Sequence, residues 1–232
     1  MNRLLITLKL DIMLQVRNQL YVITAGVALL LVALLRQLFA ANTIALVIPA
    51  LLLFGMAIYL YFAAGMFLLE RGQRTLSAVI ITPLRLTEYV TARVVSLSLL
   101  ALLETLLIVL LSYGWQLAWL PLLAGTLAMA SIFVLAGLLM VVRYDSITTF
   151  LMPSMLFVIL LQLPWIDYAG IWSNPIFYAF PTQPAFLLMQ AGFASLSTGQ
   201  LLYASIGSLV WIGLFAWWSY RAFTHYVIQQ GG

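Results

Sequence analysis

Six long apolar stretches constrain the fold of this chain more than any other feature of its sequence. Each is close to the roughly 20 apolar residues that a helix needs to cross the hydrocarbon core of a bilayer. The stretches lack the period-two alternation of membrane-barrel strands, so we expect helices. The sequence therefore predicts an all-α, polytopic membrane protein whose residues 1–232 form one transmembrane domain. The six predicted spans are residues 20–41, 44–69, 91–113, 117–141, 147–164 and 203–222.

The composition agrees with a membrane location. Hydrophobic residues make up 65% of the chain and charged residues only 7%, whereas typical soluble domains contain about 25% charged residues. The absence of cysteine excludes disulfides and cysteine-based metal sites. The first twenty residues lack a short apolar core followed by a small-residue cleavage site. We therefore expect no cleaved signal peptide and assign the insertion signal to the first span.

The basic residues predict how the spans are oriented. If the amino terminus is cytosolic, Arg36 is the one basic residue of ten that lies outside. The positive-inside rule then predicts that both termini are cytoplasmic. We expect a multi-pass protein of the plasma membrane, which is the inner membrane in a bacterium. The net charge of +4 is distributed between the spans. It is therefore not the footprint of a nucleic-acid-binding protein.

Three segments outside the spans are expected to have structure of their own. Residues 3–18 place polar side chains on one helical face and apolar side chains on the opposite face, which is typical of a helix in the membrane interface. Residues 70–82 are expected to form a short cytosolic helix after a break at Gly72. Residues 165–202 contain prolines and many aromatic residues. We expect them to form short re-entrant helices in the outer leaflet.

The beginning of the 70–82 segment is the strongest candidate for a binding surface. A basic cytosolic loop is expected from the positive-inside rule alone. The long second span, the glycine break and the short helix nevertheless make this segment a charged projection from the membrane, which favours docking of a cytosolic partner. The candidate docking residues are Glu70, Arg71, Gly72, Gln73, Arg74, Thr75 and Leu76.

Catalytic and metal-binding motifs are missing from the sequence. His225 is the single histidine and has no carboxylate near it in sequence, so we interpret it as an interfacial or partner-contact residue. The chain lacks a P-loop motif, and Lys9 is its single lysine. A machine powered by ATP would therefore need an ATPase on another chain. We expect that this chain is not an enzyme and holds no cofactor or metal.

Glu104 is the one carboxylate near the middle of a predicted span. A charge at that depth costs roughly 2.5–3.5 kcal/mol on insertion scales. The side chain could attract cations or relay protons along a pathway, or it could form a structural hydrogen bond with a Ser, Thr or Tyr of another helix. The structural interpretation is favoured because the other span interiors offer no second carboxylate or basic partner.

A transport path would be lined by adaptable side chains, since methionine and aromatic surfaces suit varied apolar ligands. Most such residues are expected to pack in the core or to face lipid. The candidate path residues are Tyr59, Phe62, Glu104, Met152 and Met155.

The order of these segments resembles that of the ABC-2 type permeases, which are the membrane subunits of type V ABC exporters. Within that family the chain is most similar to the fluoroquinolone-export permeases, and the resemblance covers nearly the full length. It is carried by Leu10–Arg17, by Glu70–Arg85 with Glu88-Tyr89, by Asn174–Tyr178 with Pro181-Thr182-Gln183, and by Tyr226–Gln229.

The resemblance implies a partner set and a mechanism. Two six-span permease subunits, identical or paralogous, would face each other in the lipid. Each would hold a separate ATPase subunit, which binds ATP and Mg²⁺, through the amino-terminal helix and the 70–82 coupling helix. Residues Glu70 to Leu76 would carry the coupling. Spans 2 and 5 would line the path, and residues 165–202 would gate its outer end.

The cargo implied by the resemblance is a hydrophobic or amphipathic small molecule, for example a drug, that is moved outward. Two other classes stay open at this point. A proton-coupled secondary carrier would use Glu104, and a membrane scaffold subunit would transport nothing.

Overall fold

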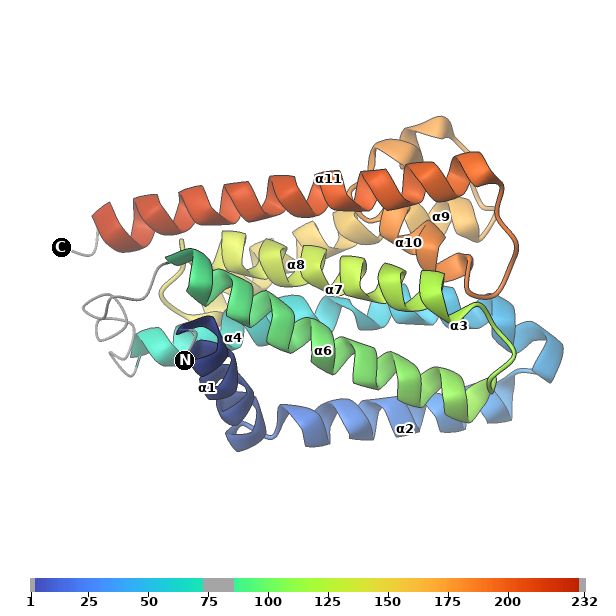
Figure 1. The fold of residues 1–232 in the computed structure, drawn as a ribbon, viewed down its shortest axis with the longest axis horizontal. Helices are drawn as coiled ribbons and strands as arrows, with labels where there is room; N and C mark the ends of the chain where they lie inside the picture. The colour runs from blue at the N-terminus through green and yellow to red at the C-terminus, as the bar shows by residue number, and fades with distance from the viewer. Residues whose placement is uncertain (1–2, 73–85, 230–232) are drawn as a thin grey trace.

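The computed structural model describes residues 3–72 and 86–229. These residues form helices joined by short turns, without a strand (Figure 1). The helices are α1 (Arg3–Arg17), α2 (Leu20–Leu38), α3 (Ala41–Gly55), α4 (Ala57–Gly72), α6 (Leu86–Ser112), α7 (Trp119–Val141), α8 (Ile147–Gln162), α9 (Pro164–Tyr168), η1 (Pro175–Ala179), α10 (Gln183–Gln190), α11 (Thr198–Phe223) and the π-helical turn η2 (Thr224–Gln229).

Six of the helical segments in the described residues are long and apolar enough to cross a membrane, which confirms the predicted fold class. They run over Leu20–Leu38, Thr43–Gly72, Leu86–Ser112, Trp119–Val141, Ile147–Tyr168 and Thr198–Tyr226.

The segments differ from the predicted spans in their boundaries, and the second also differs in regularity. The second consists of α3 and α4, which are separated by an irregular residue at Met56. The last begins at Thr198, five residues before the predicted start, because Ser197 and Gln200 form a capping box. Such a box satisfies backbone N–H groups at a helix start and fixes where the helix begins.

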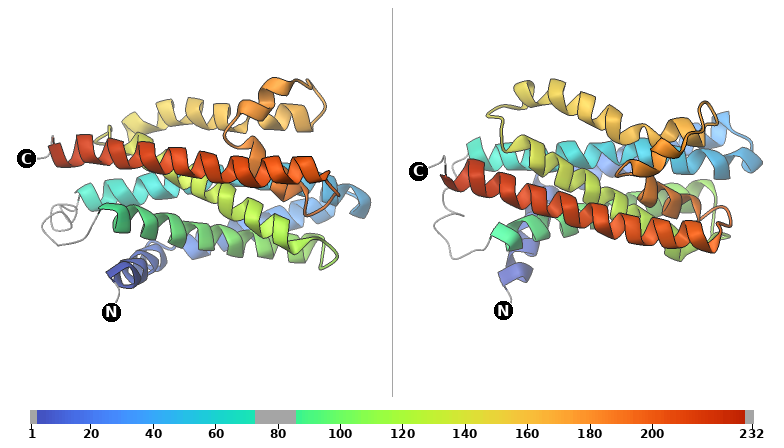
Figure 2. Two further views of the ribbon diagram at one scale, coloured as in Figure 1. Left: turned by 45° about the horizontal axis from the view of Figure 1, so that its top comes forward. Right: turned by 90° about the horizontal axis from the view of Figure 1, so that it is seen from above.

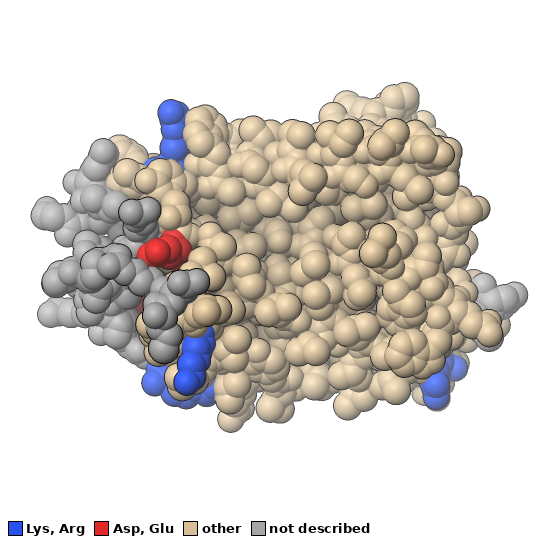
Figure 3. Space-filling view, viewed as in Figure 1, with Lys and Arg blue, Asp and Glu red and all other residues tan. Residues whose placement is uncertain are grey.

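The bundle has two ends of different character. The helix ends around the described residues 3, 72, 86 and 229 lie together on one side, which we call the termini end (Figure 1). On the face shown in Figure 3, charged side chains lie at the two ends, and a wide uncharged band separates them. An uncharged band of this kind is what the hydrocarbon core of a bilayer requires.

Helix α7 is the centre of the bundle and packs against α4, α6, α10 and α11 (Figures 1 and 2). Of an apolar stretch of 18 residues in α7, 72% is buried, against 17% of the corresponding stretch within Thr198–Tyr226. Two glycines let other backbones approach it closely. A Cβ on Gly137 would lie 2.4 Å from the carbonyl oxygen of Leu60, and one on Gly125 would lie 2.6 Å from the backbone nitrogen of Met189. Small residues at such contacts are typical of helix packing in membranes.

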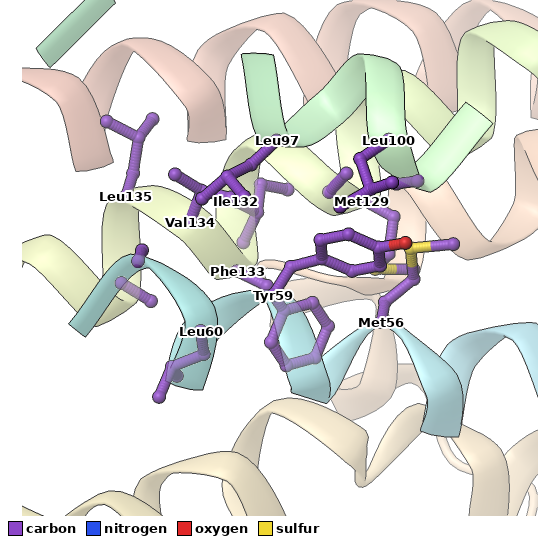
Figure 4. Packing of buried hydrophobic residues seen from close by; sticks show 14 of the residues in the cluster. Met56, Tyr59, Leu60, Leu97, Leu100, Met129, Ile132, Phe133, Val134 and Leu135 are labelled. Carbon is purple, nitrogen blue, oxygen red and sulfur yellow. The ribbon is translucent and has the colours of Figure 1, made fainter. Parts of the chain in front are cut away.

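The side chains between these helices form one apolar core. Figure 4 shows Tyr59 of α4 beside Leu100 of α6 and Met129 of α7. Tyr59 is fully buried, so its hydroxyl group needs a partner inside the protein.

The proline-rich stretch after α8 forms short helices, and its prolines begin them. Pro164 and Pro175 are the first residues of α9 and η1, and Pro184 is the second residue of α10. This position suits proline, since the first helical N–H groups have no partner within the helix. α10 is buried against α7 and α11, and the hydroxyl of Thr182 donates to the carbonyl of Leu161. α10 is thus a packed part of the bundle, whereas most of residues 169–180 are exposed.

Candidate functional site

A group of buried polar and charged side chains joins three helices at the termini end. Asp11 and Gln15 come from α1, Glu70 from the last turn of α4, and Tyr89, Arg93 and Ser96 from the first turns of α6. We call these six residues the charge cluster. Helices α4 and α6 are the two helices that flank residues 73–85.

Arg93 is the centre of the charge cluster. Its Nε lies 2.8 Å from Oδ1 of Asp11, and its Nη2 lies 2.5 Å from Oε1 of Glu70. The exposed fraction of the side chain is 1% for Arg93, 5% for Asp11 and 14% for Glu70. The guanidinium group also lies 5.3 Å from the centre of the Tyr89 ring. One cation therefore bridges two carboxylates from different helices.

Hydroxyl and amide groups complete the hydrogen bonding of the two carboxylates. The Tyr89 hydroxyl donates to Oε2 of Glu70 at 2.7 Å. The Ser96 hydroxyl donates to Oδ2 of Asp11, and Nε2 of Gln15 donates to the Ser96 hydroxyl at 2.8 Å. Buried charges are tolerated when they are paired and hydrogen-bonded in this way. The arrangement fixes the position of α1 against the ends of α4 and α6.

Arg71 extends the connections of α4 in the opposite direction. Its Nη2 lies 2.7 Å from Oδ1 of Asp145, and its Nη1 donates to the carbonyl of Tyr144 at 3.1 Å. Both acceptors belong to the turn between α7 and α8. Two consecutive residues, Glu70 and Arg71, therefore connect the end of α4 to α1 and α6 on one side and to the α7–α8 turn on the other.

The predicted docking residues lie only partly in the described structure. Glu70, Arg71 and Gly72 are the last residues of α4, so the described part of this helix ends at Gly72, the position of the predicted break. Gln73, Arg74, Thr75, Leu76 and the remainder of the predicted 70–82 helix lie outside the described residues.

Residues 2–231 match the fluoroquinolones export permease protein family. The chain belongs to this family.

Two relatives of the permease come from Mycobacterium tuberculosis. Each is named a fluoroquinolones export permease protein, one from strain ATCC 25618 / H37Rv and one from strain CDC 1551 / Oshkosh. Both are 30% identical to this chain over 237 residues, which covers 100% of this chain and 99% of the relative. Together with the six apolar helices, these matches identify the chain as a multi-pass membrane protein and a transport permease subunit.

Glu104 is buried in the middle of the permease and has a partner on another helix. Oε2 of Glu104 accepts a hydrogen bond of 2.5 Å from the Tyr59 hydroxyl of α4. The exposed fraction is 5% for Glu104 and 0% for Tyr59. This is the type of contact that the structural interpretation of Glu104 requires, and it satisfies the buried Tyr59 hydroxyl.

The candidate path residues of the permease do not share one surface. Tyr59 and Glu104 contact each other inside the bundle, and Phe62 packs edge-on against the Tyr59 ring at 5.8 Å. Met152 and Met155 are exposed on α8, away from that contact. His225 stacks edge-on against Tyr226 at 4.9 Å in η2. Among the described residues, no group of three or more His, Cys, Asp or Glu side chains could hold a metal ion.

Sequence reasoning missed Arg93 as the centre of the charge cluster. The predicted third span begins at residue 91. This boundary leaves Arg93 among the basic residues of the cytosolic side. The helix begins at Leu86, which places Tyr89, Arg93 and Ser96 on one helical face at spacings of four and three residues. That spacing is the local signal that could have revealed the cluster.

The amino-terminal helix has its polar face toward the protein. Asp11 and Gln15, which lie on the predicted polar face, are buried against α6. Leu10, Met13 and Val16 are exposed. Asp11 is therefore the partner of a buried arginine. This contact explains the polar face of α1, which the sequence pattern alone does not explain.

Proposed function

We propose that the permease is the membrane subunit of an ABC exporter of the ABC-2 type. In this proposal a separate ATPase subunit binds and hydrolyses ATP, and two permease subunits, identical or paralogous, form the transport path. Both termini lie in the cytoplasm, so the termini end of the bundle meets the ATPase. The chain has no P-loop motif, which supports this division of labour.

The observation that carries the proposal is the position of the charge cluster. It joins α1 to both helices that flank residues 73–85, and Arg71 joins the same end of α4 to the α7–α8 turn. A partner that pushes on this end would move α1, α4 and α6 together, because their relative positions are held by paired buried charges. Glu70 and Arg71 would pass that motion to the rest of the bundle.

The proposed cargo is a hydrophobic or amphipathic small molecule, and fluoroquinolones are the first compounds to test. Both relatives carry fluoroquinolone export in their names. In this proposal α1 lies in the membrane interface, and the short helices between α8 and α11 form the outer gate.

A reconstituted complex tests the proposal. The permease would be placed in lipid vesicles with its candidate ATPase, and ATP turnover would be measured with and without a fluoroquinolone. We expect turnover to rise with cargo. Failure of the permease to associate with any ATPase would contradict the proposal, and turnover that never responds to cargo would favour a scaffold subunit.

The variant Glu70→Gln tests the coupling role of the charge cluster. The amide keeps the shape of the carboxylate and removes the charge that faces Arg93. We expect the response of ATP turnover to cargo to fall at least several-fold, while association with the ATPase persists. Asp167→Asn makes the same chemical change at the other end of the bundle and serves as the matched control. A normal cargo response in Glu70→Gln would remove the charge cluster from the coupling path.

The alternative of a proton-coupled carrier rests on Glu104. Its hydrogen bond with Tyr59 favours a structural role, since a proton relay usually needs a chain of ionisable groups. Transport that persists with a catalytically inactive ATPase and stops when the proton gradient is dissipated would support the carrier.

A further inference from the structure

A pocket lies at the termini end of the bundle, between the carboxyl ends of α7 and α11. Its volume is about 660 Å³. Leu139 and Arg143 line it from α7 and the turn that follows, Trp218 and Arg221 from α11, and His225 and Tyr226 from η2. The pocket shares no residue with the charge cluster, and the proposed coupling mechanism does not use it.

The two arginines of the pocket are positioned by aromatic rings. The Arg143 guanidinium lies 5.6 Å from the centre of the Tyr226 ring, and that of Arg221 lies 4.4 Å from the centre of the Trp217 ring. Such stacking holds a guanidinium in place and leaves its N–H edge available to an anion. A guanidinium can then bind two phosphate oxygens at once.

Carboxylates do not neutralise these arginines in the described part of the chain. All six Asp and Glu residues fall within residues 3–72 and 86–229, and no ion pair among these described residues includes Arg143 or Arg221. Asp145, two residues after Arg143, is bound to Arg71. Among the described residues, the two positive charges of the pocket therefore have no carboxylate counterion, and the pocket attracts an anion.

The remainder of the pocket is apolar and borders the uncharged band of the bundle. Leu139, Trp218 and Ala222 line it beside the arginines. Trp217, Trp218 and Tyr220 are exposed at the same level of α11, where aromatic residues usually meet the membrane–water interface. A ligand that fits this surface has a negative headgroup and an apolar chain.

We propose that this pocket binds the phosphate group of an anionic phospholipid, such as phosphatidylglycerol or cardiolipin. The phosphate lies between Arg143 and Arg221, and an acyl chain lies along Leu139 and Trp218. Basic pockets between helices at the cytoplasmic side of membrane proteins bind lipids of this class. The inference uses the membrane location of the chain and depends neither on the ATPase nor on the cargo.

The inference is tested by lipid titration of the purified full-length permease. Native mass spectrometry in a zwitterionic detergent would count bound phosphatidylglycerol and, separately, phosphatidylcholine. A basic residue near a membrane surface contributes about five-fold in affinity for anionic lipid. We expect the double variant R143Q/R221Q to lose about twenty-fold or more in phosphatidylglycerol affinity. K9Q/R36Q removes two exposed positive charges elsewhere and should lose no more than about five-fold in affinity.

Three results would overturn the inference. Equal losses in the two double variants would mean that net charge alone attracts the lipid. Inorganic phosphate that protects the permease from thermal unfolding as well as phosphatidylglycerol does would mean a free anion site. Loss of ATPase association in R143Q/R221Q with unchanged lipid affinity would assign the arginines to a protein surface.

Folding of the double variant can be checked independently. Arg143 and Arg221 are exposed, so we expect an unchanged thermal midpoint in zwitterionic lipid. If the variant did not fold, the unmodified chain would still give a test, because phosphate–guanidinium contacts weaken as salt screens them. Phosphatidylglycerol binding that is insensitive to salt would contradict the site.

Discussion

Helices α4 and α6 contact each other through two polar pairs that differ in depth and in chemistry. At the termini end, Glu70 binds Arg93 in a cluster of opposite charges. Deeper in the bundle, Tyr59 donates one hydrogen bond to Glu104. The two helices are antiparallel. In each helix, the residue of the first pair lies three turns, or roughly 16 Å, from the residue of the second pair.

The difference between the two pairs indicates which contact holds more of the structure in place. The charged pair includes α1 as a third helix through Asp11, so breaking it leaves carboxylates buried without a cation. The deeper pair joins only two helices. Its one carboxyl group, that of Glu104, can be replaced by a neutral amide of similar shape. Buried ion pairs are costly to break even where they add little net stability. The charged pair should therefore be the more sensitive one.

The variant Arg93→Met would break the charged pair and should have the largest effect. It leaves Asp11 and Glu70 buried without their cation, which costs about 3–5 kcal/mol. For a chain of this size we expect a fall in the thermal midpoint of roughly 6–20 °C, measured by thermal unfolding in detergent. Arg221→Met removes an exposed arginine and is the matched control. A fall of less than roughly 3 °C in Arg93→Met would show that the cluster does not hold α1, α4 and α6 together.

The variant Glu104→Gln would sharpen the comparison at the deeper pair. The amide oxygen can still accept the Tyr59 hydroxyl, so we expect a loss of only about 0.5–1.5 kcal/mol. Expression and ATP turnover of the complex should be normal, and transport should be kept. Severe loss of transport at normal expression and normal ATP turnover would give Glu104 a functional role.

The contrast between the two pairs also shows what sequence patterns can predict. The six membrane helices follow from long apolar runs, and Glu104 was recognisable as an isolated charge within one of them. The charge cluster was not predicted, because Arg93 lies near a helix start that was assigned five residues too late. Its partner Asp11 is far away in sequence. Hydropathy gives the helices, whereas such a pair depends on how the helices pack.

The variant Arg71→Gln should have the smallest effect on stability, although Arg71 is adjacent to Glu70. The Arg71 and Asp145 side chains are 41% and 87% exposed, and exposed ion pairs contribute about 0–1 kcal/mol. We expect the thermal midpoint to fall by less than roughly 4 °C. A fall as large as that of Arg93→Met would mean that burial does not explain why the ion pairs of Glu70 and Arg71 differ in their contribution to stability. With the fold intact, a weaker response of ATP turnover to cargo would show that the exposed side of the α4 terminus also carries motion, through the α7–α8 turn.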